Sequence, residues 1–342
     1  MKIHLIPTMG SLHLRYPNYN AISVSDLLTT INPDALVITS LNESELSSPS
    51  WQDCEEIVLP MSVIPWARQS KTKTFYFKEE SPDPNAYNDF RRYARAHPQL
   101  QEKISQCDLV LRPLNSLLLE PLNLERILLE VVPIIYENKK LEEELLEEGP
   151  ATNWQRTRTR ALADRILNIN EDNIAVLVAI DDYPLLKEEL EKKADLPELS
   201  RIKVNKKSQQ RALMDYAFRT EVANAEQLVE QLSEIDSAEA GYHIANIMLA
   251  NGELEQAYQT ILEASKGNFS EPYYLPGYLL ARLGQIYDLK GNRKMALKSY
   301  QGVLAIDYAP KEAIEAAKQG LEEPFQMVAN SSNTSVEQDA EF

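Results

Sequence analysis

Residues 3–17 read IHLIPTMGSLHLRYP, and this stretch decides which fold we expect for the first half of the chain. A short apolar run at residues 3–6 ends at Pro7 and is followed by Gly10 and a polar loop that carries His13. In an open α/β sheet, a strand followed by a glycine turn brings polar side chains to the carboxyl edge of the sheet. We therefore predict a strand at residues 3–6 and a functional site near His13.

Further apolar runs continue this pattern along the chain. A helix ending near Ile31 and an apolar run at residues 35–41 complete a βαβ unit with the first strand. The run IAVLVAI at residues 174–180 is rich in β-branched side chains, which is typical of a buried strand. Residues 74–77 are another predicted strand and residues 202–204 a short edge strand, whereas residues 57–59 could begin either a strand or a helix.

These elements predict an α/β domain over residues 1–220, with a mixed sheet and a long helical insertion at about residues 84–168. Within the insertion, Arg156, Arg158 and Arg160 follow a charged helical run at residues 137–148. Residues two apart on a helix point in different directions, so Arg156 and Arg160 share a face that Arg158 does not. One of these faces could hold an anionic ligand or pair with the acidic run.

The last third of the chain has the pattern of a helical repeat. Gly284 and Ala296 are small where two helices would cross, and Tyr287 and Tyr300 would fill the neighbouring gaps. Together with Leu283 and Pro310, their spacing resembles the tetratricopeptide (TPR) repeat, and an earlier unit around residues 244–264 matches less fully. We predict an all-α, TPR-like domain at residues 221–325 and a disordered tail at residues 326–342. Helices that only cap the α/β domain are the alternative.

The composition limits the classes of partner. The 52 acidic and 35 basic residues give a formal charge of −17, which disfavours nucleic acid and anionic membranes as partners. The most apolar region, residues 109–136, is interrupted by charged residues too often to be a membrane span. Two cysteines in 342 residues suggest reduced thiols, and no secretory signal is visible. We expect a cytoplasmic protein; the sequence leaves its oligomeric state open.

The residues best suited to chemistry follow the first and last predicted strands. Of four histidines, only His13 follows a strand and a glycine turn, so it is our candidate metal ligand or general base. Asp181 and Asp182 follow the strand at residues 174–180, and their carboxylates would suit a hard cation such as Mg²⁺ or Mn²⁺. Alternatively, Asp182 caps the helix that begins near Pro184.

A third acidic group, Asp53, Glu55 and Glu56, lies close to Trp51. Glu55 or Glu56 could reach the same site if this segment packs beside the first strand. The alternative is the solvated start of a helix.

Several of these motifs together resemble the TraB/TIKI/ChaN/erythromycin-esterase-like superfamily. They are Gly10-Ser11-Leu12-His13, Pro33-Asp34 before a strand, and the helix with Arg158 followed by Leu162-Ala163. The resemblance spans about residues 3–193 and implies a site built from loops at the strand ends. In some members this site is a divalent-metal-dependent hydrolase, while others bind haem. By this resemblance His13 and Arg158 would be catalytic.

Two departures from the family pattern bear on function. The acid expected near Thr39 is absent, and Asp181-Asp182-Tyr183 stands where a second histidine is expected. We therefore expect an interaction protein with a degenerate hydrolase-like domain, whose helical repeats bind a protein or peptide. The alternative is a metal-dependent hydrolase with a site of His13, Asp181 and Asp182, for which a divalent metal ion is the candidate cofactor. The candidates for an aromatic binding face are Tyr242, Tyr258, Tyr273, Tyr274 and Tyr278.

Overall fold

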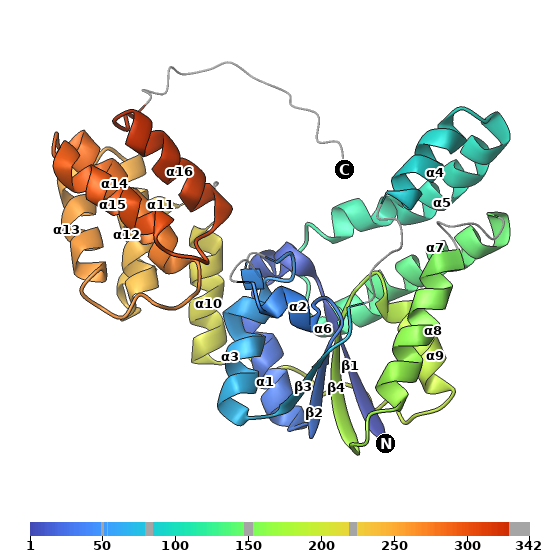
Figure 1. The fold of residues 1–342 in the computed structure, drawn as a ribbon. Helices are drawn as coiled ribbons and strands as arrows, with labels where there is room; N and C mark the ends of the chain where they lie inside the picture. Colours follow the sequence, from blue (N-terminus) through green and yellow to red (C-terminus); the bar gives the residue numbers. More distant parts are fainter. Residues whose placement is uncertain (49–50, 53, 79–84, 147–152, 219–223, 328–342) are drawn as a thin grey trace.

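The computed structural model describes residues 1–48, 51–52, 54–78, 85–146, 153–218 and 224–327. It has two lobes, an α/β lobe and a helical lobe, which are joined through one helix (Figure 1). Most of the predicted disordered tail lies outside the described residues. Within the described part of the chain, no helix is both long and apolar enough to cross a lipid bilayer.

The sheet has four parallel strands in the order β1-β4-β2-β3, and the structure corrects our expectation of a mixed sheet. Each strand returns to the sheet through helical segments, which is the connection that parallel neighbours require. The predicted edge strand at residues 202–204 is also wrong, because these residues form no strand and Val204 is 49% exposed. The strands are β1 (Lys2–Thr8), β2 (Ala35–Ile38), β3 (Lys73–Tyr76) and β4 (Asn173–Ala179).

Helices cover both faces of this sheet (Figure 1). Because successive side chains of a strand point to opposite faces, Leu36 and Ile38 join one core while Ala35 and Val37 join the other. The first core includes α1 (Ala21–Ile31) and α3 (Ile64–Ser70), and the second includes α8 (Asn153–Leu167) and α9 (Tyr183–Glu191). The open choice at residues 57–59 is settled as helix, since a π-helix at Leu59–Val63 leads into α3.

The helical insertion lies between β3 and β4, as expected. Its first two helices form a hairpin that projects away from the sheet, whereas its later part packs on both cores (Figure 1). The remaining short helices of the lobe are η1 (Gly10–Arg15) and α2 (Glu43–Leu46). The helices of the insertion that precede α8 are α4 (Ala86–Arg95), α5 (Pro98–Leu117), α6 (Leu124–Arg126), a π-helix (Ile127–Val131) and α7 (Val132–Leu145).

The helical lobe consists of consecutive helical hairpins. Gly252 and Gly291 have φ of +82° and +73° in the two hairpin turns, a conformation that favours glycine. A Cβ atom on Gly284 would lie 2.4 Å from the Tyr300 ring, which confirms that a close helix crossing requires glycine there. The helices are α11 (Ala225–Ser233), α12 (Ala238–Ala250), α13 (Leu254–Ala264), α14 (Leu275–Leu289), α15 (Arg293–Leu304) and α16 (Lys311–Glu322).

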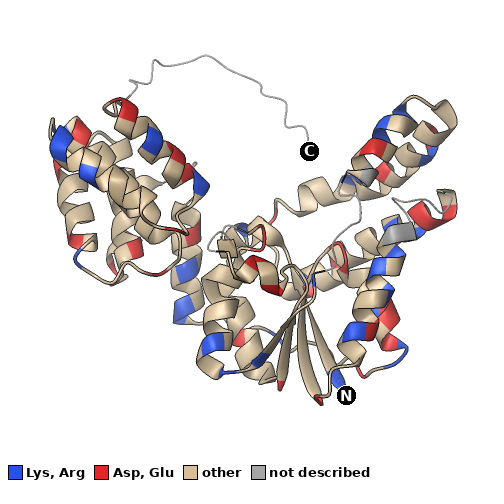
Figure 2. Cartoon of the chain, viewed as in Figure 1, with Lys and Arg blue, Asp and Glu red and all other residues tan. Residues whose placement is uncertain are grey.

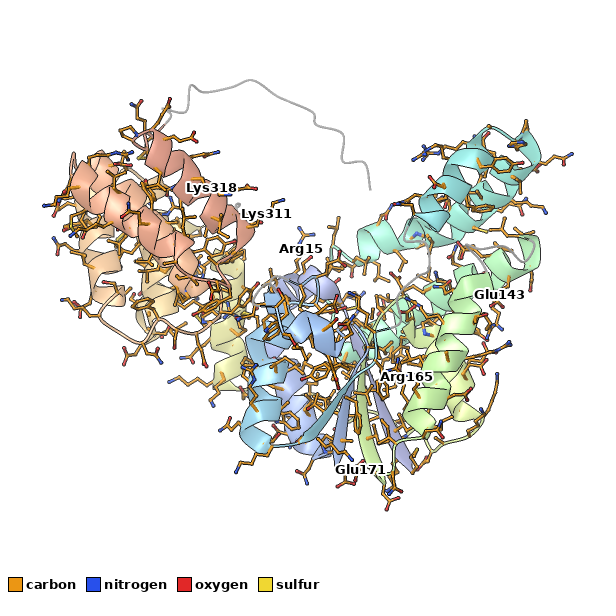
Figure 3. The ribbon with its side chains drawn as sticks, viewed as in Figure 1. Arg15, Glu143, Arg165, Glu171, Lys311 and Lys318 are labelled. Carbon is orange, nitrogen blue, oxygen red and sulfur yellow. The ribbon has the colours of Figure 1, made fainter. Side chains whose placement is uncertain are left out.

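The helix α10 (Lys206–Ala217) joins the two lobes. On one side, Asn20 Nδ2 donates to the carbonyl of Ser208 (2.8 Å), beside α1. On the other side, Arg211 is buried against α12 of the helical lobe. Side chains of both lobes also face the space between them: Figure 3 shows Arg15 on one side and Lys311 and Lys318 of α16 on the other. The helix α10 therefore connects the two lobes, and Met61 of the π-helix Leu59–Val63 also packs against the core of the helical lobe.

Candidate functional site

The carboxyl edge of the sheet is where we expected the site. β1 and β4 are neighbours, with Thr8 opposite Ala179 at their ends. The segment that carries His13 and the segment that carries Asp181 and Asp182 therefore leave the sheet from the same edge. The prediction that these two segments meet at one edge of the sheet is confirmed. Whether they form a binding or catalytic site then depends on where each side chain points.

The imidazole of His13 faces inward and is 1% exposed. Its Nε2 accepts a hydrogen bond from the backbone N–H of Met9 (3.0 Å), and its Nδ1 donates to the carbonyl of Tyr19 (2.6 Å). Burial lowers the pKa of His13 to about 4, so the ring is neutral at pH 7. Since both nitrogens are engaged, the ring closes the β1–η1–α1 turn and offers no nitrogen to a metal or substrate. His13 is a structural residue here, which corrects the predicted role.

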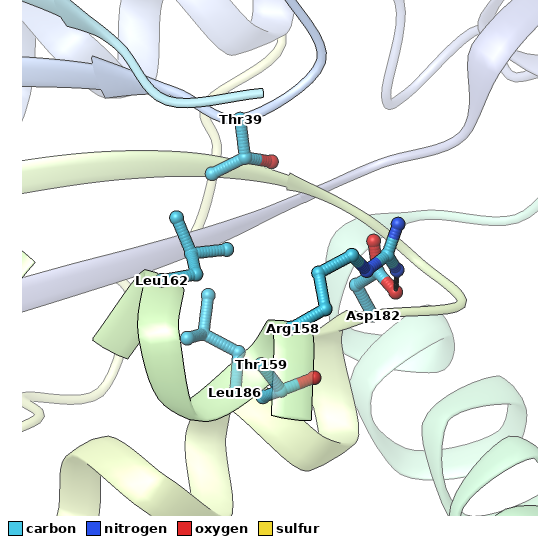
Figure 4. Close-up of a pocket in the computed structure, with 6 residues that line it drawn as sticks. All are labelled: Thr39, Arg158, Thr159, Leu162, Asp182 and Leu186. Atoms are coloured by element: carbon cyan, nitrogen blue, oxygen red, sulfur yellow. Dashed lines mark hydrogen bonds and ion pairs between the residues drawn. The ribbon is translucent and has the colours of Figure 1, made fainter. Parts of the chain in front are cut away.

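Asp182 pairs with Arg158 across α8 and α9 (Figure 4). Asp182 occupies the N-cap position of α9, as one alternative predicted, but its side chain makes no capping hydrogen bond. Burial raises the pKa of Asp182, while the Arg158 guanidinium counteracts that effect. Asp181 is exposed. Within the described ranges, no three or more His, Cys, Asp or Glu residues are arranged to hold a metal ion, so the predicted set of His13, Asp181 and Asp182 is not assembled.

A small hollow adjoins the Arg158–Asp182 pair (Figure 4). Its volume is about 10 Å³, which is room for roughly one water molecule and not for an organic substrate. Thr39, the position near which the family resemblance led us to expect an acid, lines this hollow. On a different face of α8 from Arg158, Arg156 donates to Glu143 of α7 in two hydrogen bonds of 2.8 Å. This confirms the predicted pairing with the acidic run, and it leaves Arg156 engaged inside the protein.

Glu56 reaches the carboxyl edge of the sheet. Of the two alternatives for this acidic group, packing beside the first strand therefore holds for Glu56. The backbone N–H of Gly10 donates to Glu56 Oε2 (3.1 Å) and the carboxyl group is buried. Burial raises the pKa of Glu56, hydrogen bonds from Thr8 and Gly10 oppose the rise, and the charge of Asp181 adds to it. Glu55 is solvated, and Asp53 lies outside the described residues. Glu56 therefore fastens the loop after β1.

A second candidate region lies on the helical lobe. Its rings are Phe218 at the end of α10, Tyr242 on α12, and Tyr273, Tyr274 and Tyr278 at the start of α14; we call these five residues the aromatic face. Phe218 lies 5.2 Å from Tyr274 and 5.9 Å from Tyr278 between ring centroids, and Tyr242 stacks on Tyr278 at 6.4 Å. Phe218 is 36% exposed, while Tyr273 and Tyr278 are half-buried.

The structure changes the membership of this predicted face in two ways. Tyr258 does not belong, because it lies on α13 against Tyr287 (5.8 Å) and under Lys290 (4.5 Å). Phe218 was missed, because it lies outside the repeat pattern that selected the tyrosines. Its only sequence signal is its place at the end of an amphipathic helix just before the repeats.

A buried ionic network supports the aromatic face from below. Arg211 of α10 contacts Asp215 (Nε to Oδ1, 2.7 Å) and Glu239 of α12 (Nη2 to Oε1, 2.7 Å). The Tyr274 hydroxyl donates to the same Glu239 carboxylate. Although burial would raise it, the pKa of Glu239 is held at about 2 by the Arg211 guanidinium. These bonds fix α10, α12 and the start of α14 relative to one another, so the rings are held in place.

The carboxyl edge and the aromatic face differ in which side chains they leave free to contact another molecule. At the carboxyl edge His13, Glu56 and the Arg158–Asp182 pair bind groups of the protein itself, whereas the aromatic face leaves rings exposed. The resemblances to the TraB-like superfamily and to TPR repeats stay expectations, and the function has to be argued from these two regions. Comparison with protein-family models, curated proteins and solved structures gives no match for this chain.

Proposed function

We propose that this chain is an interaction protein whose helical lobe binds a segment of a protein or peptide partner at the aromatic face. The observation that carries the proposal has two parts. Rings from three separate stretches meet in one cluster, in which Tyr242 and Tyr274 are buried while Phe218 is exposed and Tyr273 and Tyr278 are half-buried. The predicted catalytic histidine, in contrast, has both nitrogens bonded internally. The α/β lobe then serves as a non-catalytic support, connected through α10.

The energetics favour such a role for the face. Large aromatic side chains that are partly exposed and rigidly held supply much of the binding energy at protein interfaces. Here the buried Arg211–Glu239 pair and the Tyr274 hydroxyl hold the rings, so little ordering would be needed on binding. Consecutive helical hairpins also present several helices to one partner segment.

The alternative proposal, a metal-dependent hydrolase, would need a different arrangement at the carboxyl edge. An imidazole would have to turn outward, which breaks the bonds of His13 to Met9 and Tyr19. No contact of His13 favours that state, so we place the function on the helical lobe.

Replacing Phe218 by alanine is expected to weaken partner capture at least about tenfold, because an interface ring at a hot spot contributes well over 1 kcal/mol. The measurement uses the full chain, immobilised, with partners recovered from an extract of cells that express it natively. Tyr258→Ala is the matched control, since it removes a half-buried tyrosine of the same lobe away from the face. Capture that survives Phe218→Ala but is lost with Arg158→Ala would move the site to the carboxyl edge.

A further inference from the structure

One carboxylate at the margin of the aromatic face has no basic partner in the part of the chain that the structure describes. Glu312 of α16 is exposed and accepts a hydrogen bond from the Tyr278 hydroxyl (Oη to Oε2, 3.1 Å). Among the residues that the structure describes, no Lys, Arg or His nitrogen lies within 4.0 Å of it, and the adjacent Lys311 is paired with Glu315. In contrast, two other acids of this lobe, Glu239 and Asp288, have arginine partners.

The rings beside Glu312 are suited to a cation. An ammonium or guanidinium group is attracted to the face of an aromatic ring, and more strongly where a carboxylate stands nearby. Phe218 and Tyr278 lie 5.9 Å apart and are both partly exposed. Burial raises the pKa of Tyr278, and Glu312 adds to the effect, so its hydroxyl remains a donor to Glu312.

The charge of the whole chain acts in the same direction. The formal charge of −17 creates a field that draws basic segments toward the protein and repels acidic ones. Acidic and basic residues are interspersed along the helices of both lobes (Figure 2), so the attraction is general and the choice of site has to be local. The local feature is the carboxylate of Glu312 beside two partly exposed rings.

We infer that the partner segment presents a lysine or arginine side chain over Phe218 and Tyr278, with its cation paired to Glu312. This inference rests on the proposed function and names the chemistry of its partner. Arg282, one turn further along α14, contacts Gln285 (Nη1 to Oε1, 2.8 Å) and lies within no ion pair of the described chain. Arg282 is therefore the residue that would pair with the partner if the partner segment were acidic instead of basic.

The test uses the full chain and pools of random nonapeptides that differ only at the central position. Pools with lysine or arginine at the centre are expected to bind about fivefold more tightly than pools with norleucine, the size of a partly exposed cation–π contact. Glu312→Gln should reduce the preference, because it removes the paired carboxylate and leaves the rings. Glu315→Gln, which removes the same charge from the same helix, should retain it. Both side chains are exposed, so the variants are expected to fold.

Other outcomes would overturn the inference. Equal retention of all pools, or retention of none, contradicts the inference. A preference for glutamate-centred pools that disappears in Arg282→Gln contradicts it as well. The proposed function fails separately, through partner capture that is unaffected by Phe218→Ala. A cation preference that is absent while Phe218 remains essential therefore rejects the partner chemistry and leaves the face in place.

Discussion

Replacing Arg211 with alanine is expected to lower the free energy of unfolding by about 3–5 kcal/mol, the range for breaking a buried ion pair by removing one partner. The guanidinium is buried and is the cation for both Asp215 and Glu239. Without it, two carboxylates remain in a poorly solvated position next to the Tyr274 hydroxyl. The loss should also loosen α10 from α12, and therefore weaken the aromatic face.

Urea unfolding of the full chain measures this effect. The matched control is Arg201→Ala, which removes an arginine that is 86% exposed and paired with Glu125. Exposed pairs contribute about 0–1 kcal/mol, so this variant should unfold almost as the unmodified protein does. Similar small losses in both variants would show that the Arg211 network does not hold the lobes together.

Replacing His13 with alanine is expected to destabilise the protein by about 3 kcal/mol at pH 7, because the Met9 N–H and the Tyr19 carbonyl lose their buried partner. The effect should depend on pH with a defined sign. The pKa of His13 is about 4 in the folded protein, against 6.5 for an ordinary histidine, so between these values the unfolded chain binds more protons. His13 therefore stabilises fully above pH 6.5 and loses roughly 3 kcal/mol of that contribution as the pH falls to 4.

Comparing the unmodified protein with His13→Ala over pH 4–7 isolates this titration, since the other groups are common to both. The gap in unfolding free energy should shrink on acidification. His13→Asn, which can keep the donor to the Tyr19 carbonyl, should recover part of the stability without the pH dependence. A gap that stays constant with pH would contradict a buried neutral imidazole.

The sequence predicted the sheet well because local signals specify it. Residues 174–180 are apolar on both faces, which only a central parallel strand buries, and β4 is flanked on both sides by other strands. These local signals do not determine whether neighbouring strands run parallel or antiparallel, so we expected a mixed sheet. The close crossing at Gly284 was also predictable, because small residues at repeat spacing require a neighbour such as Tyr300.

The roles of the site residues were harder to predict. The spacing around His13 correctly placed it beside the carboxyl edge, but its burial depends on Tyr19 and Met9, whose contacts are set by the turn conformation. Glu56 reaches Gly10 across 46 residues, and no local pattern encodes such a contact. Phe218 was missed for a similar reason: it joins the tyrosines only through the packing of α10 on the repeats.

The most direct test of the central claim is photo-cross-linking of the full chain to its recovered partner. One preparation carries p-benzoylphenylalanine in place of Phe218, on the aromatic face, and another carries it in place of Thr39, beside the Arg158–Asp182 pair. We predict a covalent adduct with the partner from position 218 and none from position 39. An adduct from position 39 with none from position 218 would contradict the account and return the function to the α/β lobe.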